Sequence, residues 1–337
     1  MNKLFIKIVS FLGLFPFLFL SPNLAFASPR IIDLGLYNGG DTVVYAINNL
    51  NQVAGYCLVN LLPHACFYNG TNWVDLGTLG GEFSYAFGIN DNDQIVGFSR
   101  TSSGATHGFL WQNGTMSELT SLSSYESAGS SINNQGQIAG YSYVDQTHKH
   151  ATLWQNGSIV DLGTLPGGDI SSANAINNVG VVIGTSNFDP TEIYHMFIWK
   201  DGLMTDVGLA GSYNTIPSSI NDSNQVAGRV LAVPVPSTGP QAYFWSNGKY
   251  TRLPNLGTDP TVAMGINNIG VVVGYSTIKF SNTTHAYAWY NNQITDLGVL
   301  SNVFNTSQAT SINQKGVIAG FSVDDHFRTH GVLWVRN

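Results

Sequence analysis

Residues 131–163 read SINNQGQIAGYSYVDQTHKHATLWQNGSIVDLG, and this stretch contains four short strand patterns separated by turns. Its first turn, Asn134-Gln135-Gly136, consists of residue types that tolerate the positive φ angles of tight hairpins. Its last turn contains Asn156-Gly157, the strongest short-range hairpin signal. No segment after residue 27 has a sustained helical period. The stretch therefore predicts a four-stranded antiparallel unit.

The same pattern occurs seven times along the chain, at steps of 42–46 residues. Each copy has an Ile-Asn pair, and a glycine follows seven residues after each of these asparagines. Six copies have a histidine four residues before a Trp or Tyr, and the fifth has Gln241 instead. Seven residues after the aromatic, the first six copies have a triplet similar to Asp-Leu-Gly, which in the fifth copy is Arg252-Leu253-Pro254. The Ile-Asn pairs begin at Ile47, Ile89, Ile132, Ile176, Ile220, Ile266 and Ile312.

Four strands in about 44 residues is the size of one β-propeller blade, and a linear β-solenoid is the alternative. Residues 31–35 match a fourth strand with no preceding three, and the last copy contains three strands without a fourth. In a closed ring the first strand would complete the last blade and leave no exposed sheet edge. We therefore expect an all-β fold, a single seven-bladed β-propeller with four-stranded blades.

Two kinds of repeated position agree with a propeller. The residue before each repeated Ile is Ala, Gly or Ser, as expected where the innermost strands crowd around the axis. The repeated Ile, Trp and Tyr side chains are expected to form core between the blades.

The composition excludes several classes of protein. Only 10% of the 337 residues are charged, 12% are aromatic and 37 are glycine, whereas disordered chains and coiled coils have few aromatics and many charges. The net charge of −7 gives no support to nucleic-acid binding, which requires a basic surface.

The N-terminal residues have the layout of a secretory signal peptide. Lys3 and Lys7 precede an apolar stretch over residues 8–20, and Ala25-Phe26-Ala27 supplies small residues for cleavage after Ala27. An uncleaved membrane anchor is the alternative, but the apolar run is short and contains Pro16. We expect residues 1–27 to be removed and residues 28–337 to form an exported, extracellular or periplasmic propeller with no further membrane span.

The sequence has two cysteines, Cys57 and Cys66. In an exported chain such a pair favours a disulfide, and two buried thiols are the alternative. The recurring histidines would lie one blade apart, too far to share a metal ion, so a structural hydrogen bond to a neighbouring turn is expected at each. The segment Asp91-Asn92-Asp93 resembles a calcium loop but lacks the glycine and the glutamate that such a loop requires. No cofactor is expected, and a structural cation such as calcium stays open.

Only two connections vary in length between copies: glycine to histidine spans 9–13 residues, and the DLG-like triplet to the next Ile spans 14–16. In an up-and-down blade both lie on one face, and variable loops on a rigid scaffold are where binding usually occurs. Acidic residues there would approach the channel mouth and attract a cation or a basic partner, although solvated turn residues are the simpler interpretation. The candidate ligand-binding residues on this face are Asp41, Glu82, Glu126, Asp169, Asp259, His148, Asp189, Tyr194, Asp325 and His326.

The segments at residues 107–114, 161–168 and 175–178 resemble the bacterial HAF family of probable extracellular repeats, and the resemblance extends over residues 31–337. It implies export and a repeat scaffold, with no catalytic residues to transfer.

Three functions remain open at this point. The first is a monomeric binding scaffold that takes an extracellular protein or glycan on the variable-loop face. The second is a secreted hydrolase or lyase that cleaves glycan or peptide with an acidic site at the channel mouth. The third is a purely structural repeat of the envelope or matrix.

Overall fold

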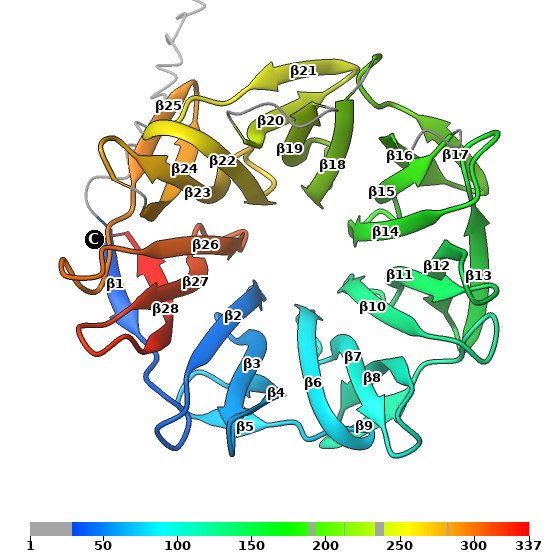
Figure 1. Cartoon of the computed structure of the whole chain (residues 1–337), viewed down its shortest axis with the longest axis horizontal. Coiled ribbons are helices and arrows are strands. Elements are labelled where there is room, and N and C mark those ends of the chain that lie inside the picture. The colour runs from blue at the N-terminus through cyan, green and yellow to red at the C-terminus, as the bar shows by residue number, and fades with distance from the viewer. Residues whose placement is uncertain (1–28, 189–192, 212, 233–238, 282, 337) are drawn as a thin grey trace, which may run out of the picture.

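The computed structural model describes residues 29–188, 193–211, 213–232, 239–281 and 283–336. The chain forms seven four-stranded antiparallel sheets around a central axis, as Figure 1 shows. The prediction of an all-β, seven-bladed propeller is therefore confirmed. The predicted signal peptide, residues 1–27, lies outside the described residues. In the part that the structure describes, no helix is long and apolar enough to cross a membrane.

Within each of blades 1 to 6 the strands follow chain order from the axis outward (Figure 1). Blade 1 contains β2 (Thr42–Ile47), β3 (Val53–Val59), β4 (Leu62–Tyr68) and β5 (Trp73–Asp75). Blade 2 contains β6 (Gly80–Ile89), β7 (Ile95–Thr101), β8 (Thr106–Gln112) and β9 (Thr115–Glu118). Blade 3 contains β10 (Ser127–Ile132), β11 (Ile138–Tyr143), β12 (Lys149–Gln155) and β13 (Ser158–Gly163). Blade 4 contains β14 (Ser171–Ile176), β15 (Val182–Asn187), β16 (Tyr194–Lys200) and β17 (Leu203–Asp206). Blade 5 contains β18 (Tyr213–Ile220), β19 (Val226–Ala232), β20 (Gln241–Ser246) and β21 (Lys249–Arg252). Blade 6 contains β22 (Gly257–Ile266), β23 (Val272–Ile278), β24 (Thr284–Tyr290) and β25 (Gln293–Asp296).

The seventh blade closes the ring with a strand from the other end of the chain. It contains β26 (Ser307–Ile312), β27 (Ile318–Val323) and β28 (Thr329–Val335), and β1 (Arg30–Asp33) is its outermost strand. The pairing is antiparallel, with Arg30 opposite Val335 and Ile31 opposite Trp334. The expectation that the first strand completes the last blade is therefore confirmed.

Each innermost strand contains a β-bulge, one extra residue opposite its neighbouring strand. In blade 2 the register steps from Ala86 to Gly88 and leaves Phe87 unpaired. The glycine of the second strand, Gly97 in this blade, lies so close to the bulge that a Cβ atom would overlap the carbonyl oxygen of Tyr85. All seven copies share this contact, which explains why the spacing from asparagine to glycine never varies: Gly55, Gly97, Gly140, Gly184, Gly228, Gly274 and Gly320.

The hydrophobic core is divided into seven clusters of buried residues, each lying between two adjacent blades. Between blades 1 and 2, for example, Phe67 packs with Ile89, Ile95 and Phe109. The repeated Ile residues are 5–8% exposed, and the repeated Trp or Tyr belong to or pack against these clusters. The predicted role of both as core between the blades is confirmed.

The repeated asparagines form a closed ring of hydrogen bonds that joins all seven blades. The side-chain amide of Asn48 donates to the carbonyl oxygen of Asn90, that of Asn90 to Asn133, and so on around to Asn313, which donates back to Asn48. The seven N···O distances are 3.0–3.3 Å, and the side chains are at most 4% exposed.

A second ring runs beside the first. In it the backbone N–H that follows each repeated asparagine donates to a side-chain oxygen of the next blade, at 2.7–3.0 Å. Asp91, which resembled part of a calcium loop, accepts such a bond from Asn49. The repeated Ile-Asn pair is thus the fastening between blades as well as the end of a strand.

The repeated histidines contact the acids of the outermost strands. Nδ1 lies 2.7–3.3 Å from a carboxylate oxygen in the pairs His64–Asp75, His107–Glu118, His150–Asp161, His195–Asp206, His285–Asp296 and His330–Asp33. In blade 5 both partners are replaced together, by Gln241 and Arg252. The histidines therefore have a structural role as expected, but their partner is the acid of the outermost strand and not a neighbouring turn. The pairs explain why histidine and acid recur at a fixed spacing.

The disulfide is also present. Cys57 in β3 and Cys66 in β4 are bonded, with their Cα atoms 5.7 Å apart, and both side chains are fully buried. The predicted bridge is confirmed.

Candidate functional site

The two ends of the propeller differ in construction. We call the end that carries the Ile-Asn turns the turn face. We call the opposite end, with the connections between second and third strands and between successive blades, the loop face. At the turn face the channel is a small space of about 160 Å³ that is lined by the repeated Ile and by the two rings of asparagine, aspartate and glutamine.

The middle of the channel contains a cavity of about 360 Å³. Ligand pockets usually measure about 300–1,000 Å³, so this cavity has the size for a small ligand or for one end of a larger one. Every blade contributes its bulge residue to the wall: Tyr45, Phe87, Ser130, Asn174, Ser218, Met264 and Thr310. Ser172, Ala173, Ile216, Pro217 and Arg229 complete it.

Sequence reasoning missed this set of residues, although a signal was present. The bulge position lies two residues before each repeated Ile, next to the uniformly small position, and it has a different character in almost every copy. A bulge releases its residue from the strand pairing, so this side chain can vary without disturbing the sheet. Variation inside an otherwise uniform strand was the signal.

One wall of the cavity is aromatic. The rings of Tyr45 and Phe87 have centroids 5.4 Å apart. Tyr56 lies 6.0 Å from Tyr45, Phe98 lies 5.4 Å from Phe87, and Tyr85 lies 5.2 Å from both Tyr56 and Phe98. All five rings are half-buried, which leaves part of their apolar surface open to the channel or the loop face. We refer to these five residues as the aromatic wall.

The hydroxyl groups of Tyr45 and Tyr56 are neutral at physiological pH. Burial raises the pKa of Tyr45 to about 12, and the neighbouring Tyr56 and Tyr85 add to this effect. Burial also raises the pKa of Tyr56. These phenols therefore remain hydrogen-bond donors for a ligand.

The opposite wall carries a cation and an unsatisfied acceptor. Arg229 comes from blade 5, which in a seven-membered ring faces the boundary between blades 1 and 2 (Figure 1). Within the described residues its guanidinium group has no ion-pair or hydrogen-bond partner, whereas Arg252 and Arg328 are paired with Asp259 and Asp41. Asn174 Oδ1 is buried and has no donor within the described part of the chain. Neither group has a partner among the residues that the structure describes.

Three of the loop-face acids that sequence reasoning selected, Asp41, Asp169 and Asp259, are bound to local partners. Asp41 accepts from Arg328 at 3.0 Å, in a groove between blades 7 and 1. Asp259 accepts from Arg252 at 2.9 Å. Asp169 accepts from the side chain of Asn187 at 2.6 Å and lies 3.5 Å from Nε2 of His148. Asp145, 2.7 Å from Nδ1 of the same histidine, raises its pKa.

The remaining predicted residues are scattered over the same face. Glu82 and Glu126 are exposed, Asp325 accepts from the hydroxyl of Ser301, and His326 is exposed. The backbone N–H of Tyr194 donates to Asn214 Oδ1 at 2.7 Å, and Asp189 lies outside the described residues. The nine described residues do not line the channel cavity, and in the described chain no three His, Cys, Asp or Glu side chains are grouped to hold a metal ion. A ligand-binding role for them stays a prediction.

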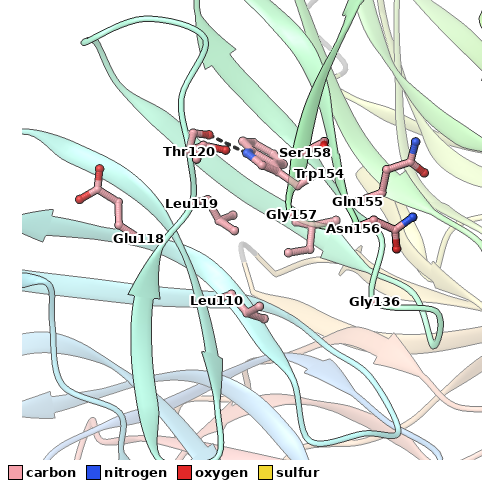
Figure 2. Close-up of a pocket in the computed structure, with 11 residues that line it drawn as sticks. Leu110, Glu118, Leu119, Thr120, Gly136, Trp154, Gln155, Asn156, Gly157 and Ser158 are labelled. Atoms are coloured by element: carbon pink, nitrogen blue, oxygen red, sulfur yellow. Dashed lines mark hydrogen bonds between the residues drawn. The ribbon is translucent and has the colours of Figure 1, made fainter.

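A further hollow of about 200 Å³ lies between blades 2 and 3, away from the axis. Figure 2 shows that the indole N–H of Trp154 donates to the carbonyl oxygen of Thr120 there, at 2.6 Å, which fastens blade 3 to the connection after blade 2. Its one acidic residue, Glu118, is paired with His107 at 3.3 Å. This hollow is therefore part of the blade packing.

Solved structures similar to this chain share its fold at low sequence identity. A puromycin-hydrolyzing peptidase from Mycobacterium tuberculosis gives a TM-score of 0.59 at 10% identity, over 87% of this chain and 50% of that one. An oligogalacturonate lyase in complex with manganese gives 0.55 at 12% identity, over 92% and 98% of the two chains. The β-propeller domain of the Trilobed protease from Pyrococcus furiosus gives 0.50 at 9% identity, over 87% and 94%.

These likenesses place the chain in the structural class of β-propellers and carry no activity over to it. The chain spans about half the length of the peptidase. No family model matches the sequence, and no curated protein is significantly similar to it.

Proposed function

We propose that this protein is an exported binding scaffold that takes a protein or glycan ligand from its loop face, at the channel. The observation that carries the proposal is that neighbouring positions of the innermost strands have different roles. The positions that fasten the ring are uniform in all seven blades, whereas the bulge residue beside them varies and lines the cavity. Variable residues on a rigid, repeated frame are typical of a binding surface.

Export is supported by the disulfide, because such bonds persist in oxidising compartments, and by the signal-peptide pattern of residues 1–27. The resemblance to HAF repeats agrees with export. Fractionation of the producing cells, followed by N-terminal sequencing, tests this part of the proposal. We expect a chain that begins at Ser28, in the periplasm or the medium.

Binding is tested with immobilised polysaccharides and a peptide library. We expect Phe87→Ala to weaken capture of the bound ligand at least about tenfold, because it removes an aromatic face from the cavity. Phe280→Ala is the matched control, since Phe280 is 94% exposed on a hairpin of blade 6 outside the cavity. Equal effects of the two substitutions would contradict a channel site.

The hydrolase or lyase alternative makes a different prediction. It requires turnover of a glycan or peptide that Asp169→Ala or Glu82→Ala abolishes. The arrangement of Asp41, Asp169 and Asp259, each held by a neighbouring side chain, favours binding without catalysis.

A further inference from the structure

The wall of the channel cavity has three chemical features, each on a different part of the wall. The first is the aromatic wall, where Tyr45 and Phe87 present ring surface to the cavity. Removing apolar surface from water is favourable, so this wall suits a flat, partly apolar group. The phenol of Tyr45 makes no hydrogen bond within the described residues, and it adds a donor to the same wall.

The second feature is the unpaired guanidinium of Arg229 on the opposite wall. A half-buried cation without a counter-charge costs solvation free energy, and the planar fork of arginine fits a carboxylate in a bidentate manner. No carboxylate of the described chain lies within ion-pair distance of Arg229. An anionic ligand in the cavity would supply this counter-charge.

The third feature is the polar rim between the two walls. Asn174 Oδ1 is a buried acceptor without a donor, and leaving such a group unpaired is costly. Ser130, Ser172 and Ser218 add hydroxyl groups around the same cavity. These hydroxyls suit a ligand with several hydrogen-bonding groups, and phosphate or a simple carboxylate supplies few of them.

We propose that the cavity binds a saccharide that carries a carboxylate, such as a uronic acid, with its carboxylate on Arg229 and its sugar ring on Tyr45 and Phe87. The hydroxyl groups of the sugar form hydrogen bonds with the hydroxyls of Ser130, Ser172 and Ser218. The inference rests on the proposed function, because it names the class of ligand for the same site. A neutral sugar would leave Arg229 without its anion, and an acidic peptide would offer fewer hydroxyl groups to Ser130, Ser172 and Ser218.

The test uses calorimetric titration of the exported chain with dimers of galacturonate, glucuronate and mannuronate, and with the methyl ester of each. We expect at least one acid to bind, and its ester to bind at least about tenfold more weakly, as loss of a charged hydrogen bond predicts. Arg229→Gln should remove this difference by weakening the acid alone, and Arg229→Lys should restore part of it. Arg100→Gln is the matched control, because Arg100 lies over the ring of Phe83, outside the cavity.

The outcomes separate the inference from the proposed function. Binding of neutral saccharides or of peptides that Phe87→Ala weakens, with no preference for the acid, overturns the inference and leaves the proposed function standing. Failure of every uronate to bind overturns the inference. Failure of every saccharide and peptide overturns both. Thermal unfolding of Arg229→Gln at the wild-type temperature excludes misfolding as the cause of lost affinity.

Discussion

The turn face and the channel wall are built from the same strands, two residues apart, and they follow opposite rules. At the turn face the same Ile, Asn and neighbouring polar residues recur in every blade and bond to the next blade. On the channel wall the bulge residue ranges from Tyr45 to Ser130 to Met264. The comparison teaches that the bulge uncouples the two positions, so the lining can change while the fastening stays fixed.

The largest effect is expected from adding a side-chain atom where the second strand packs against a bulge. Gly97→Ala places a Cβ atom onto the carbonyl oxygen of Tyr85, and neither backbone can move without disrupting the bulge. We expect a loss of about 3 kcal/mol or more in the free energy of unfolding, measured by urea denaturation.

Gly88→Ala is the control for that substitution. The equivalent residues in blades 1 and 4 are Ala46 and Ala175, and a Cβ atom at Gly88 would come no closer than 3.1 Å to a neighbour, so we expect a smaller loss than at Gly97. A variant Gly97→Ala as stable as Gly88→Ala would show that the bulge is not what fixes the glycine.

The next largest effect is expected from the asparagine ring. Asn133→Ala removes the bond to the carbonyl of Asn177 and leaves the backbone N–H groups of Gln135 and Gln137 without their acceptor. Because the bond to Asn177 is buried and joins two blades, we expect a loss of about 2–3 kcal/mol, seen as a lower Tm. Ser130→Ala, at the bulge three residues earlier, should stay within about 0.5 kcal/mol of the wild type. Similar losses from the two would contradict the contrast between fastening and lining.

The disulfide stabilises one hairpin of the loop-face half in blade 1. Replacing both cysteines, as Cys57→Ala with Cys66→Ala, should lower the free energy of unfolding by about 2 kcal/mol, since the bond closes only a short loop. Reduction of the wild type with dithiothreitol should give a similar fall in Tm. A reductant that lowers the Tm of the cysteine-free variant as well would act through something other than this bond.

The smallest expected effect is a change of stability with pH. It should occur at the histidine–acid pairs and not at the two rings of hydrogen bonds formed by asparagine side chains. Hydrogen bonding to Asp296 raises the pKa of His285 above its ordinary value of 6.5. A group whose pKa is raised by folding contributes stability that is fully present below its unfolded pKa and is lost as the pH rises through the folded pKa. The difference in Tm between the wild type and His285→Gln should therefore be largest below about pH 6.5 and shrink above it.

His326→Gln serves as the control for the pH experiment, because His326 is exposed and has only a distant acid, Asp324, at 3.9 Å. Asn133→Ala should show the same loss at every pH in this range, since amides do not titrate. A gap at His285 that widens as the pH rises would contradict the assigned sign.

Sequence alone predicted the fold because the features that define it repeat. The Ile-Asn pair and the glycine recur at fixed positions in all seven copies, and the histidine in six, which locates the strands. The pattern of residues 31–35 predicted the closing strand. The asparagine ring was not foreseen, since Asn48 and Asn90 lie 42 residues apart and their bond depends on how blades stack. The candidate site was not predicted for a related reason, because Arg229, Asn174 and Tyr45 come together only across the ring. The predicted site residues were charged residues of the loops, whereas the cavity is lined by the one variable residue of each innermost strand.

The closing strand has a consequence for the order in which the protein is made. β1 is synthesised first, yet its partner β28 is synthesised last, with Arg30 opposite Val335. During synthesis the first six blades can form in turn, while β1 stays unpaired until β28 is made. A product that stops short of β28 leaves β1 without a partner and the ring open, so closure of the seventh blade distinguishes finished chains from truncated ones.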